Sequence, residues 1–217
     1  ALICKLQARL GTSARALEFS ILCASRSGEV RGALWDEFDL EAGLWTIPAE
    51  RMKASKEHRV PLAPQAIQLL QSLPRFDKES HVFGAPRGGP LSDMSLTAVL
   101  KRMGQTGVTQ HGFRSTFRDW AGETTNYARE VIEHALAHQL KDKAEAAYQR
   151  GDLLQKRTSV REIRRRIDHQ TDCHHPRDAT ARYRRKRRRA PAQRPKLGPA
   201  YRHDESVGLT DSRKVRA

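Results

Sequence analysis

The chain of 217 residues is long enough for one domain with a hydrophobic core, followed by a tail. Its formal net charge of +15 at pH 7 indicates a polyanionic partner, for which nucleic acid is the common choice. No stretch approaches the roughly 20 apolar residues that a membrane helix requires, and the N-terminus carries no secretory signal. The first residue is Ala1, which is compatible with a fragment of a longer protein.

The positive charge is concentrated near the C-terminal end. Residues 1–156 carry 21 Lys and Arg against 18 Asp and Glu, a balance of +3, whereas residues 157–217 carry 19 against 7, a balance of +12. We therefore divide the chain into a domain at residues 1–157 and a basic tail, rich in arginine and proline, at residues 158–217. Such a tail cannot bury enough apolar surface to offset the loss of chain entropy, so we expect it to be disordered.

Apolar patterning and turn residues predict the elements of the N-terminal half. In chain order they are a buried helix at 14–25, a short helix at 30–35, a turn at Gly43 and a strand at 44–48. Residues 52–53 and 58–62 flank a polar turn at 54–57, which predicts a hairpin. Pro64 then opens a helix over 65–73, because proline is favoured at the first helical position.

The C-terminal half of the domain is predicted to be helical. Phe113, Phe117 and Trp120 are spaced to bury one face of a helix. The predicted helices lie at 94–103, 111–123, 129–140 and 145–154.

Several polar residues of the domain suit chemistry on a phosphodiester. Cleavage of a DNA strand requires a nucleophile, cations at the non-bridging oxygens and an acid at the leaving oxygen, and arginines can neutralise the phosphate without a metal. His111 and Arg114 are three residues apart, so their side chains share one helix face. In chain order the candidates are Arg26, Lys53, His111, Arg114, His138 and Tyr148.

This order of residues resembles the catalytic domain of the tyrosine site-specific recombinases, the phage-integrase family. The resemblance covers roughly residues 5–157 and is greatest to prophage and genomic-island integrases. It implies a mainly α fold with a small antiparallel β-sheet that carries Lys53, as in DNA breaking-rejoining enzymes. The segments that carry it are Arg26-Ser-Gly-Glu-Val-Arg-Gly-Ala-Leu-Trp-Asp-Glu37, Ile47-Pro-Ala-Glu-Arg-Met-Lys53, His58-Arg-Val-Pro-Leu62 and His111-Gly-Phe-Arg-Ser-Thr-Phe-Arg-Asp-Trp120.

The resemblance implies how the scissile phosphate is held. Arg26 and Arg114 would clamp its non-bridging oxygens, and His138 would hydrogen-bond to it. Glu29 would not contact the phosphate itself but would orient the side chain of Arg26 or His111. The expected contacts to the rest of the DNA are Arg51, Lys56, Arg59 and Arg118.

The resemblance also implies the covalent step. Tyr148 would form a 3′-phosphotyrosyl link, His111 would help to take its proton or hold the phosphate, and Lys53 would protonate the leaving 5′ oxygen. Because the link keeps the bond energy, a second strand can be rejoined without ATP, a metal or any cofactor. The expected partner is double-stranded DNA carrying attachment sites, bound by a homo-oligomer (a tetramer in the family) on the nucleoid in the bacterial cytoplasm.

Competing interpretations exist for single residues. Lys56 competes with Lys53 in the same loop, and Tyr127 is the rival nucleophile, although it follows Arg114 closely. His134 and His138, four residues apart, have the spacing of a metal pair, but no third ligand has an obvious spacing.

Competing functions exist for the whole chain as well. A type IB topoisomerase would share the chemistry, a decayed prophage integrase would bind DNA without cleaving it, and a basic nucleic-acid-binding protein would act through its tail. The similarity to integrase sequences stops near Lys156-Arg157, where we hypothesise a frameshift or a fusion to an unrelated reading frame. The family's N-terminal DNA-binding domains are not expected in this chain, which predicts weak and salt-sensitive DNA binding with little sequence selectivity.

Overall fold

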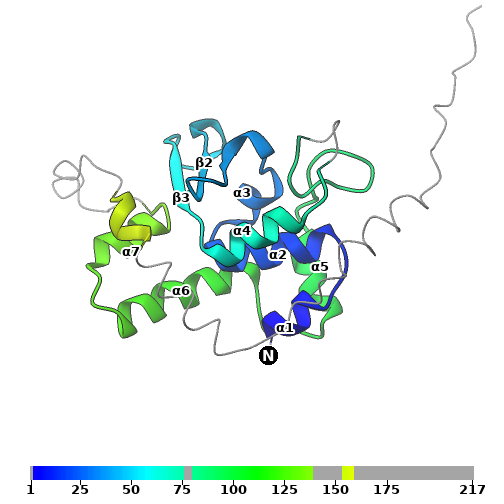
Figure 1. Ribbon diagram of the computed structural model, residues 1–217. Coiled ribbons are helices and arrows are strands. Elements are labelled where there is room, and N and C mark those ends of the chain that lie inside the picture. Colours follow the sequence, from blue (N-terminus) through cyan, green and yellow to red (C-terminus); the bar gives the residue numbers. More distant parts are fainter. Residues whose placement is uncertain (1, 76–79, 139–152, 159–217) are drawn as a thin grey trace, which may run out of the picture.

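The computed structural model describes residues 2–75, 80–138 and 153–158 of the chain (Figure 1). The predicted tail from residue 159 onward and nearly all of the predicted helix at 145–154, with Tyr148, lie outside the described residues. The helices are α1 (Leu2–Gln7), α2 (Thr12–Cys23), α3 (Ser27–Arg31), α4 (Pro64–Ser72), α5 (Ser95–Arg102), α6 (Gln110–Thr124) and α7 (Arg129–Ala135). The structure also has two 3-10 helices, η1 (Trp35–Glu37) and η2 (Ala49–Arg51). Its strands are β1 (Phe38–Asp39), β2 (Leu44–Ile47) and β3 (His58–Pro61).

Helix α2 is the central element, and it contacts α1, α3, α4, α5 and α6. Its apolar run makes it suitable for this position, since Leu17 and Phe19 are fully buried. The helix ends two residues before the predicted bound because Ala24 adopts a left-handed conformation, with φ of 48°. The chain therefore turns sharply just before Arg26.

The short helix predicted at 30–35 is displaced toward the N-terminus. It forms as α3 because Glu29 accepts a hydrogen bond of 2.8 Å from the backbone N–H of Arg26, which satisfies a donor that the first helical turn leaves open. Trp35 instead begins η1. The prediction was thus wrong in its bounds, and the reason is a local cap that apolar patterning does not register.

The sheet has three antiparallel strands in the order β1-β2-β3. The predicted turn at Gly43 is confirmed, with φ of 62°, but the hairpin predicted between residues 52–53 and 58–62 does not form. The partner of β3 was predicted wrongly, because β2 and not residues 52–53 pairs with it, and Ile47 faces His58 in the last pair. Pro48 ends the ladder since it has no N–H to donate, and Lys53 lies in the loop that follows.

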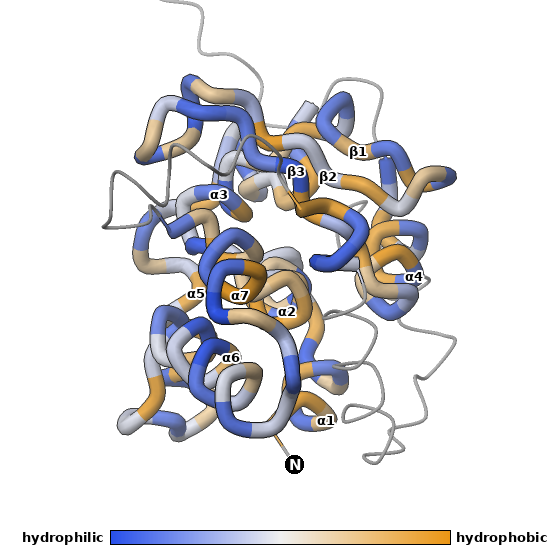
Figure 2. The backbone as a smooth tube through the Cα atoms, turned by 90° about the vertical axis from the view of Figure 1, so that its left-hand side faces the viewer, coloured by the Kyte–Doolittle hydropathy of each residue, from blue (hydrophilic) through white to orange (hydrophobic). Residues whose placement is uncertain are grey.

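Two hydrophobic clusters lie inside the described part of the chain. The larger joins the sheet to α2, where the ring of Phe19 lies 5.4 Å from that of Trp45 and 5.5 Å from that of Phe83. In Figure 2 the hydrophobic stretches, in orange, include α2, α4 and β2. The smaller is formed by Ala24, Phe117, Val131 and Leu136, with Trp120, Tyr127 and Leu153 packed against it.

The C-terminal helices follow the prediction closely up to α7. Helix α4 begins at Pro64 as expected, and α5 and α6 differ from their predicted bounds by one residue at each end. Helix α7 is shorter than predicted, because Ala137 has a φ of 47° and turns the chain away. The expected mainly helical fold with a small antiparallel sheet is confirmed. No helix within the described ranges is long and apolar enough to cross a membrane.

Candidate active site

Three of the predicted residues line one cavity of about 310 Å³. Arg26 comes from the turn between α2 and α3, Lys53 from the loop between β2 and β3, and His138 from the chain after α7. Of the described residues, Ala54 and Ala137 also line it. The fold thus brings together cationic and imidazole side chains that are far apart in the sequence.

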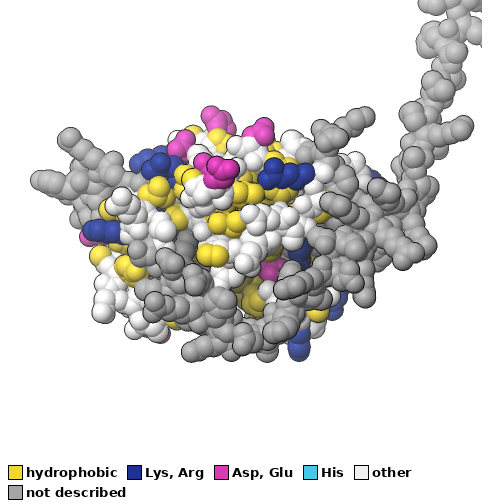
Figure 3. Space-filling view, in the orientation of Figure 1, with side chains coloured by type: hydrophobic (Ala, Val, Ile, Leu, Met, Phe, Trp, Pro, Cys, Tyr) yellow, Lys and Arg dark blue, Asp and Glu magenta, His cyan; other side chains and the backbone are white. Residues whose placement is uncertain are grey.

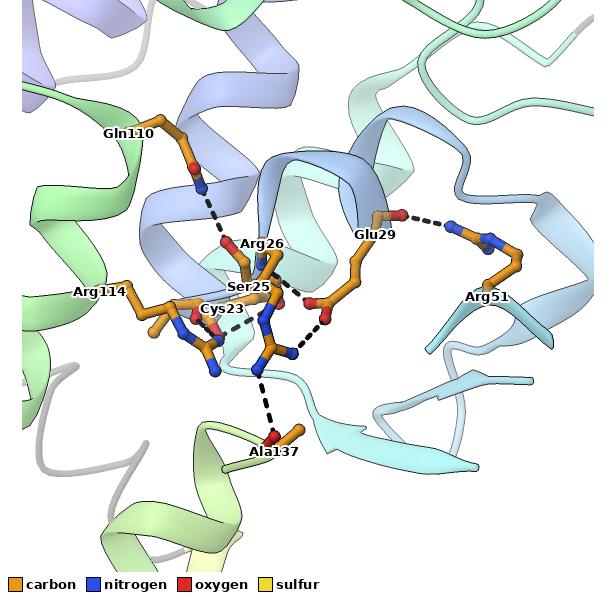
Figure 4. Close-up of polar contacts among 9 residues, drawn as sticks. Cys23, Ser25, Arg26, Glu29, Arg51, Gln110, Arg114 and Ala137 are labelled. Atoms are coloured by element: carbon orange, nitrogen blue, oxygen red, sulfur yellow. Dashed lines mark hydrogen bonds and ion pairs between the residues drawn. The ribbon is translucent and has the colours of Figure 1, made fainter. Parts of the chain in front are cut away.

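Arg26 is held on two sides (Figure 4). Its Nη1 lies 2.7 Å from Oε1 of Glu29 in an ion pair, and its Nη2 donates to the carbonyl of Ala137 at 3.2 Å. The Arg26 side chain is 28% exposed, whereas that of Glu29 is 6% exposed. Glu29 therefore fixes the guanidinium from the interior and leaves part of it open to the cavity.

Arg114 reaches the same turn from α6. Its Nη1 donates to the carbonyl of Ala24 at 2.7 Å, and the residue is 4% exposed. Figure 4 shows the guanidinium groups of Arg114 and Arg26 extending toward the same side of this turn. Two cationic groups are thereby gathered at one turn, an arrangement suited to a phosphate with its two non-bridging oxygens.

Gln110 fixes α6 against the end of α2. Its Nε2 donates to Oγ of Ser20 at 2.6 Å and to the carbonyl of Ser25 at 2.8 Å, and all three residues are buried. Sequence analysis did not identify Gln110. Its position just before His111, at the start of a helix, is the one local indication of a structural role.

His138 is held by a buried carboxylate that sequence analysis also missed. Nδ1 of His138 lies 2.5 Å from Oε2 of Glu133, and Nε of Arg118 donates to Oε1 of Glu133 at 2.7 Å. Burial alone would raise the pKa of Glu133, but the hydrogen bonds from His138 and Arg118 outweigh it and lower that pKa. The sequence offers one indication of this contact, because Glu133 precedes His138 by five residues in the helix predicted at 129–140.

Two further candidates, His111 and Tyr127, lie within the described residues. His111 is exposed in the first turn of α6, and it is not among the described residues that line the cavity. Tyr148 lies outside the described residues. Tyr127, the rival nucleophile, is half-buried against the smaller hydrophobic cluster.

The four expected DNA contacts divide into two groups. Lys56 is exposed in the loop after η2, and Arg59 is half-buried in β3. The guanidinium of Arg51 instead contacts Glu37 and the carbonyl of Glu29, and that of Arg118 is paired with Glu133. In the space-filling view of one face, Lys and Arg side chains lie in separate small groups rather than in a continuous patch (Figure 3).

The chain matches the model of a known protein family. Residues 4–152 match the model of the phage integrase family, and the chain belongs to that family. It is 36% identical over 143 residues to the prophage integrase IntA of Escherichia coli (strain K12), covering 64% of this chain and 34% of that protein. It is likewise 36% identical over 151 residues to the integrase of Enterobacteria phage P4, covering 61% of this chain and 34% of that protein.

The chain spans about a third of the length of these curated relatives. Among solved structures, the XerA recombinase superposes with a TM-score of 0.49 at 15% identity, over 78% of this chain and 62% of that chain. A λ integrase dimer bound to a COC′ core site superposes with a TM-score of 0.47 at 18% identity, over 69% of this chain and 56% of that chain. The resemblance to prophage integrases is confirmed by the family match and by the two curated relatives.

Proposed function

We propose that the chain carries the DNA-cleaving centre of a tyrosine site-specific recombinase. The observation that carries the proposal is the shared cavity of Arg26, Lys53 and His138, with Arg114 on the adjoining turn, in a member of the phage integrase family. The substrate would be double-stranded DNA carrying an attachment site, bound by several copies of the protein. No metal or cofactor is needed for this chemistry.

The phosphate would be held at the cavity by charge. Arg26 and Arg114 neutralise the non-bridging oxygens, and they stabilise the additional negative charge of the transition state more than that of the ground state. His138 donates a hydrogen bond to the same phosphate through the ring nitrogen that Glu133 does not engage. Glu29 keeps Arg26 in place, so little reorganisation is required when the phosphate arrives.

The covalent step transfers one phosphoryl bond. The oxygen of Tyr148 attacks phosphorus, its proton passes to His111, and the bond between phosphorus and the 5′ oxygen breaks. The electron pair of that bond stays on the 5′ oxygen, which takes a proton from the Lys53 ammonium. The products are a 3′-phosphotyrosyl ester and a free 5′-hydroxyl. In the reverse direction, a 5′-hydroxyl from a second strand attacks the ester and releases Tyr148.

The proposal is tested with a suicide DNA substrate, nicked near the cleavage site so that the covalent intermediate is trapped. The parent chain should yield a protein–DNA band on a denaturing gel, Tyr148→Phe should yield none, and Tyr127→Phe should behave like the parent. A band that persists in Tyr148→Phe and disappears in Tyr127→Phe would reassign the nucleophile. The absence of any band with the parent, on a substrate carrying the correct core site, would favour a DNA-binding remnant.

Two further assays separate the competing functions. Relaxation of a supercoiled plasmid without strand exchange would favour a type IB topoisomerase. Deletion of residues 158–217 should leave strand cleavage in place. Loss of cleavage in that variant would favour a function that resides in the basic tail.

A further inference from the structure

We infer that Arg51 is a positioning residue that holds the Lys53 loop against α3, and that it is not a contact to DNA. The inference rests on the proposed function, because Lys53 is taken as the acid of the cleavage step. Nη1 of Arg51 forms an ion pair with Oε1 of Glu37. Its Nη2 donates to the carbonyl of Glu29, a contact shown in Figure 4. The side chain of Arg51 is 22% exposed and that of Glu37 is 7% exposed, so the pair lies mostly inside the protein.

A close approach at Gly32 supports the same role independently. A β-carbon at Gly32 would lie 3.2 Å from Nη2 and 3.5 Å from Nε of Arg51. The φ of Gly32 is −95°, which any residue can adopt, so a side chain there would be opposed by the guanidinium of Arg51, which would have to shift by a few tenths of an ångström, and not by the backbone conformation. The guanidinium of Arg51 is therefore seated against the end of α3.

The other side of the contact is anchored in the hydrophobic core. Oε2 of Glu37 accepts a hydrogen bond of 2.9 Å from Nε1 of Trp45, which is fully buried in β2. Met52, next to Arg51, is itself 5% exposed. Lys53 thus follows directly on two residues that are fixed to the core, although its own side chain is exposed.

The contacts connect the acid to one of the phosphate ligands. Arg51 is bound to the backbone of Glu29, and the side chain of Glu29 holds Arg26. Lys53 and Arg26 line the same cavity from different segments, and Arg51 links those segments. A planar guanidinium can reach a carboxylate and a carbonyl at once, which a lysine ammonium on a flexible chain does less well.

The test compares two suicide substrates that differ at the leaving atom. One has the natural 5′ oxygen, and the other has sulfur in that position, which departs as a thiolate without a proton because thiols are far more acidic than alcohols. Arg51→Lys should form the covalent complex about 100-fold more slowly than the parent on the oxygen substrate, as a misplaced catalytic group can. On the sulfur substrate its rate should return close to that of the parent.

Matched variants separate positioning from other effects. Lys53→Ala should also cleave slowly on the oxygen substrate and regain a rate close to that of the parent on the sulfur substrate. Gly32→Ala should behave in the same way, because it keeps Arg51 but displaces its guanidinium. Glu50→Gln changes an exposed neighbour in η2 and should match the parent on both substrates. Equal slowing of Arg51→Lys on the two substrates would overturn the inference. The inference would also be overturned if Arg51→Ala lowered the slope of log DNA affinity against log salt concentration by about one, which indicates the loss of one phosphate contact.

A measurement without cleavage decides the inference even if the parent forms no covalent complex, an outcome that would count against the proposed function alone. The amides of Met52 and Ser55 donate to the carbonyls of Ala49 and Met52. Arg51→Lys should speed hydrogen exchange at these two amides and leave exchange within α4 unchanged. Unchanged exchange at Met52 and Ser55 would show that Arg51 does not hold the loop.

Discussion

Oε2 of Glu133 lies 2.5 Å from Nδ1 of His138, while the other oxygen of the same carboxylate accepts a hydrogen bond from Arg118. Glu133 is 8% exposed, so it is shielded from water on most sides. A carboxylate bound to Nδ1 orients an imidazole, and when both ring nitrogens carry protons it leaves the Nε2–H group to donate to a phosphate. Glu133 thus determines which nitrogen of His138 is available to a phosphate.

Glu133→Gln should make folding stability less dependent on acid. The pKa of Glu133 is lowered from 4.5, so its contribution to stability is present above about pH 4.5 and is lost as the pH falls through the lower pKa of the folded state. At pH 7 the variant should be about 1–3 kcal/mol less stable than the parent, because it loses hydrogen bonds to a charged group. The difference should shrink toward pH 3, as measured by urea unfolding.

The matched control is Glu123→Gln, which alters an exposed carboxylate in α6. Its stability should stay within about 0.5 kcal/mol of the parent at both pH values. A deficit in Glu133→Gln that is as large at pH 3 as at pH 7 would mean that the ionised carboxylate is not what stabilises the fold.

Gln110→Leu should destabilise the junction between α2 and α6. The variant removes the donor from the buried carbonyl of Ser25 and from the hydroxyl of Ser20. Leaving such groups without a donor costs about 1–3 kcal/mol. The change in unfolding free energy in urea measures it, with Gln105→Leu, a half-buried position in the loop before α6, as the comparison. Equal stability of both variants would contradict this account.

Arg114→Met should affect both stability and cleavage. The carbonyl of Ala24 loses a donor at 2.7 Å in a buried setting, which should cost about 1–3 kcal/mol. Cleavage of the suicide substrate should fall by about 100-fold or more, as when an oxyanion ligand is removed. Arg102→Met changes an exposed arginine and should affect neither quantity. Full cleavage activity in Arg114→Met would remove this residue from the site.

Deletion of residues 158–217 should weaken the dependence of DNA binding on salt. Residues 158–217 hold 18 of the 40 Lys and Arg residues, so they contribute much of the charge available to phosphates. Each lost phosphate contact reduces the slope of log affinity against log salt by about 0.9. Fluorescence anisotropy with a labelled duplex at several salt concentrations gives the slope. An unchanged slope would show that the tail does not contact DNA.

The grouping of the candidate residues could be predicted in part from residue type and order. Arg26, Lys53 and His138 were expected to meet, and they line one cavity. The missed residues, Glu133 and Gln110, act through hydrogen bonds to groups that only the fold brings near. The expectation that Arg51 contacts DNA stays a prediction, and its pairing with Glu37 could not be anticipated, because the sequence does not show which carboxylate a given arginine will meet in the fold.

The errors in the fold have a similar origin. Apolar periodicity located α2, α4, α5 and α6, whose buried faces repeat regularly along the chain. It misplaced α3 and the end of α7, where a single hydrogen bond or a left-handed residue sets the bound. It also paired β3 with the wrong segment, since Pro48 ends β2 five residues before Lys53.

The packing of Leu136 and Leu153 in the smaller hydrophobic cluster brings together two points of the chain that are well separated in the sequence. Arg157 adds a second link, because its Nη2 donates to the carbonyl of Arg59 in β3. Since the entropy lost on closing a segment of chain grows only slowly with its length, a few buried contacts suffice to keep residues 153–158 on the domain.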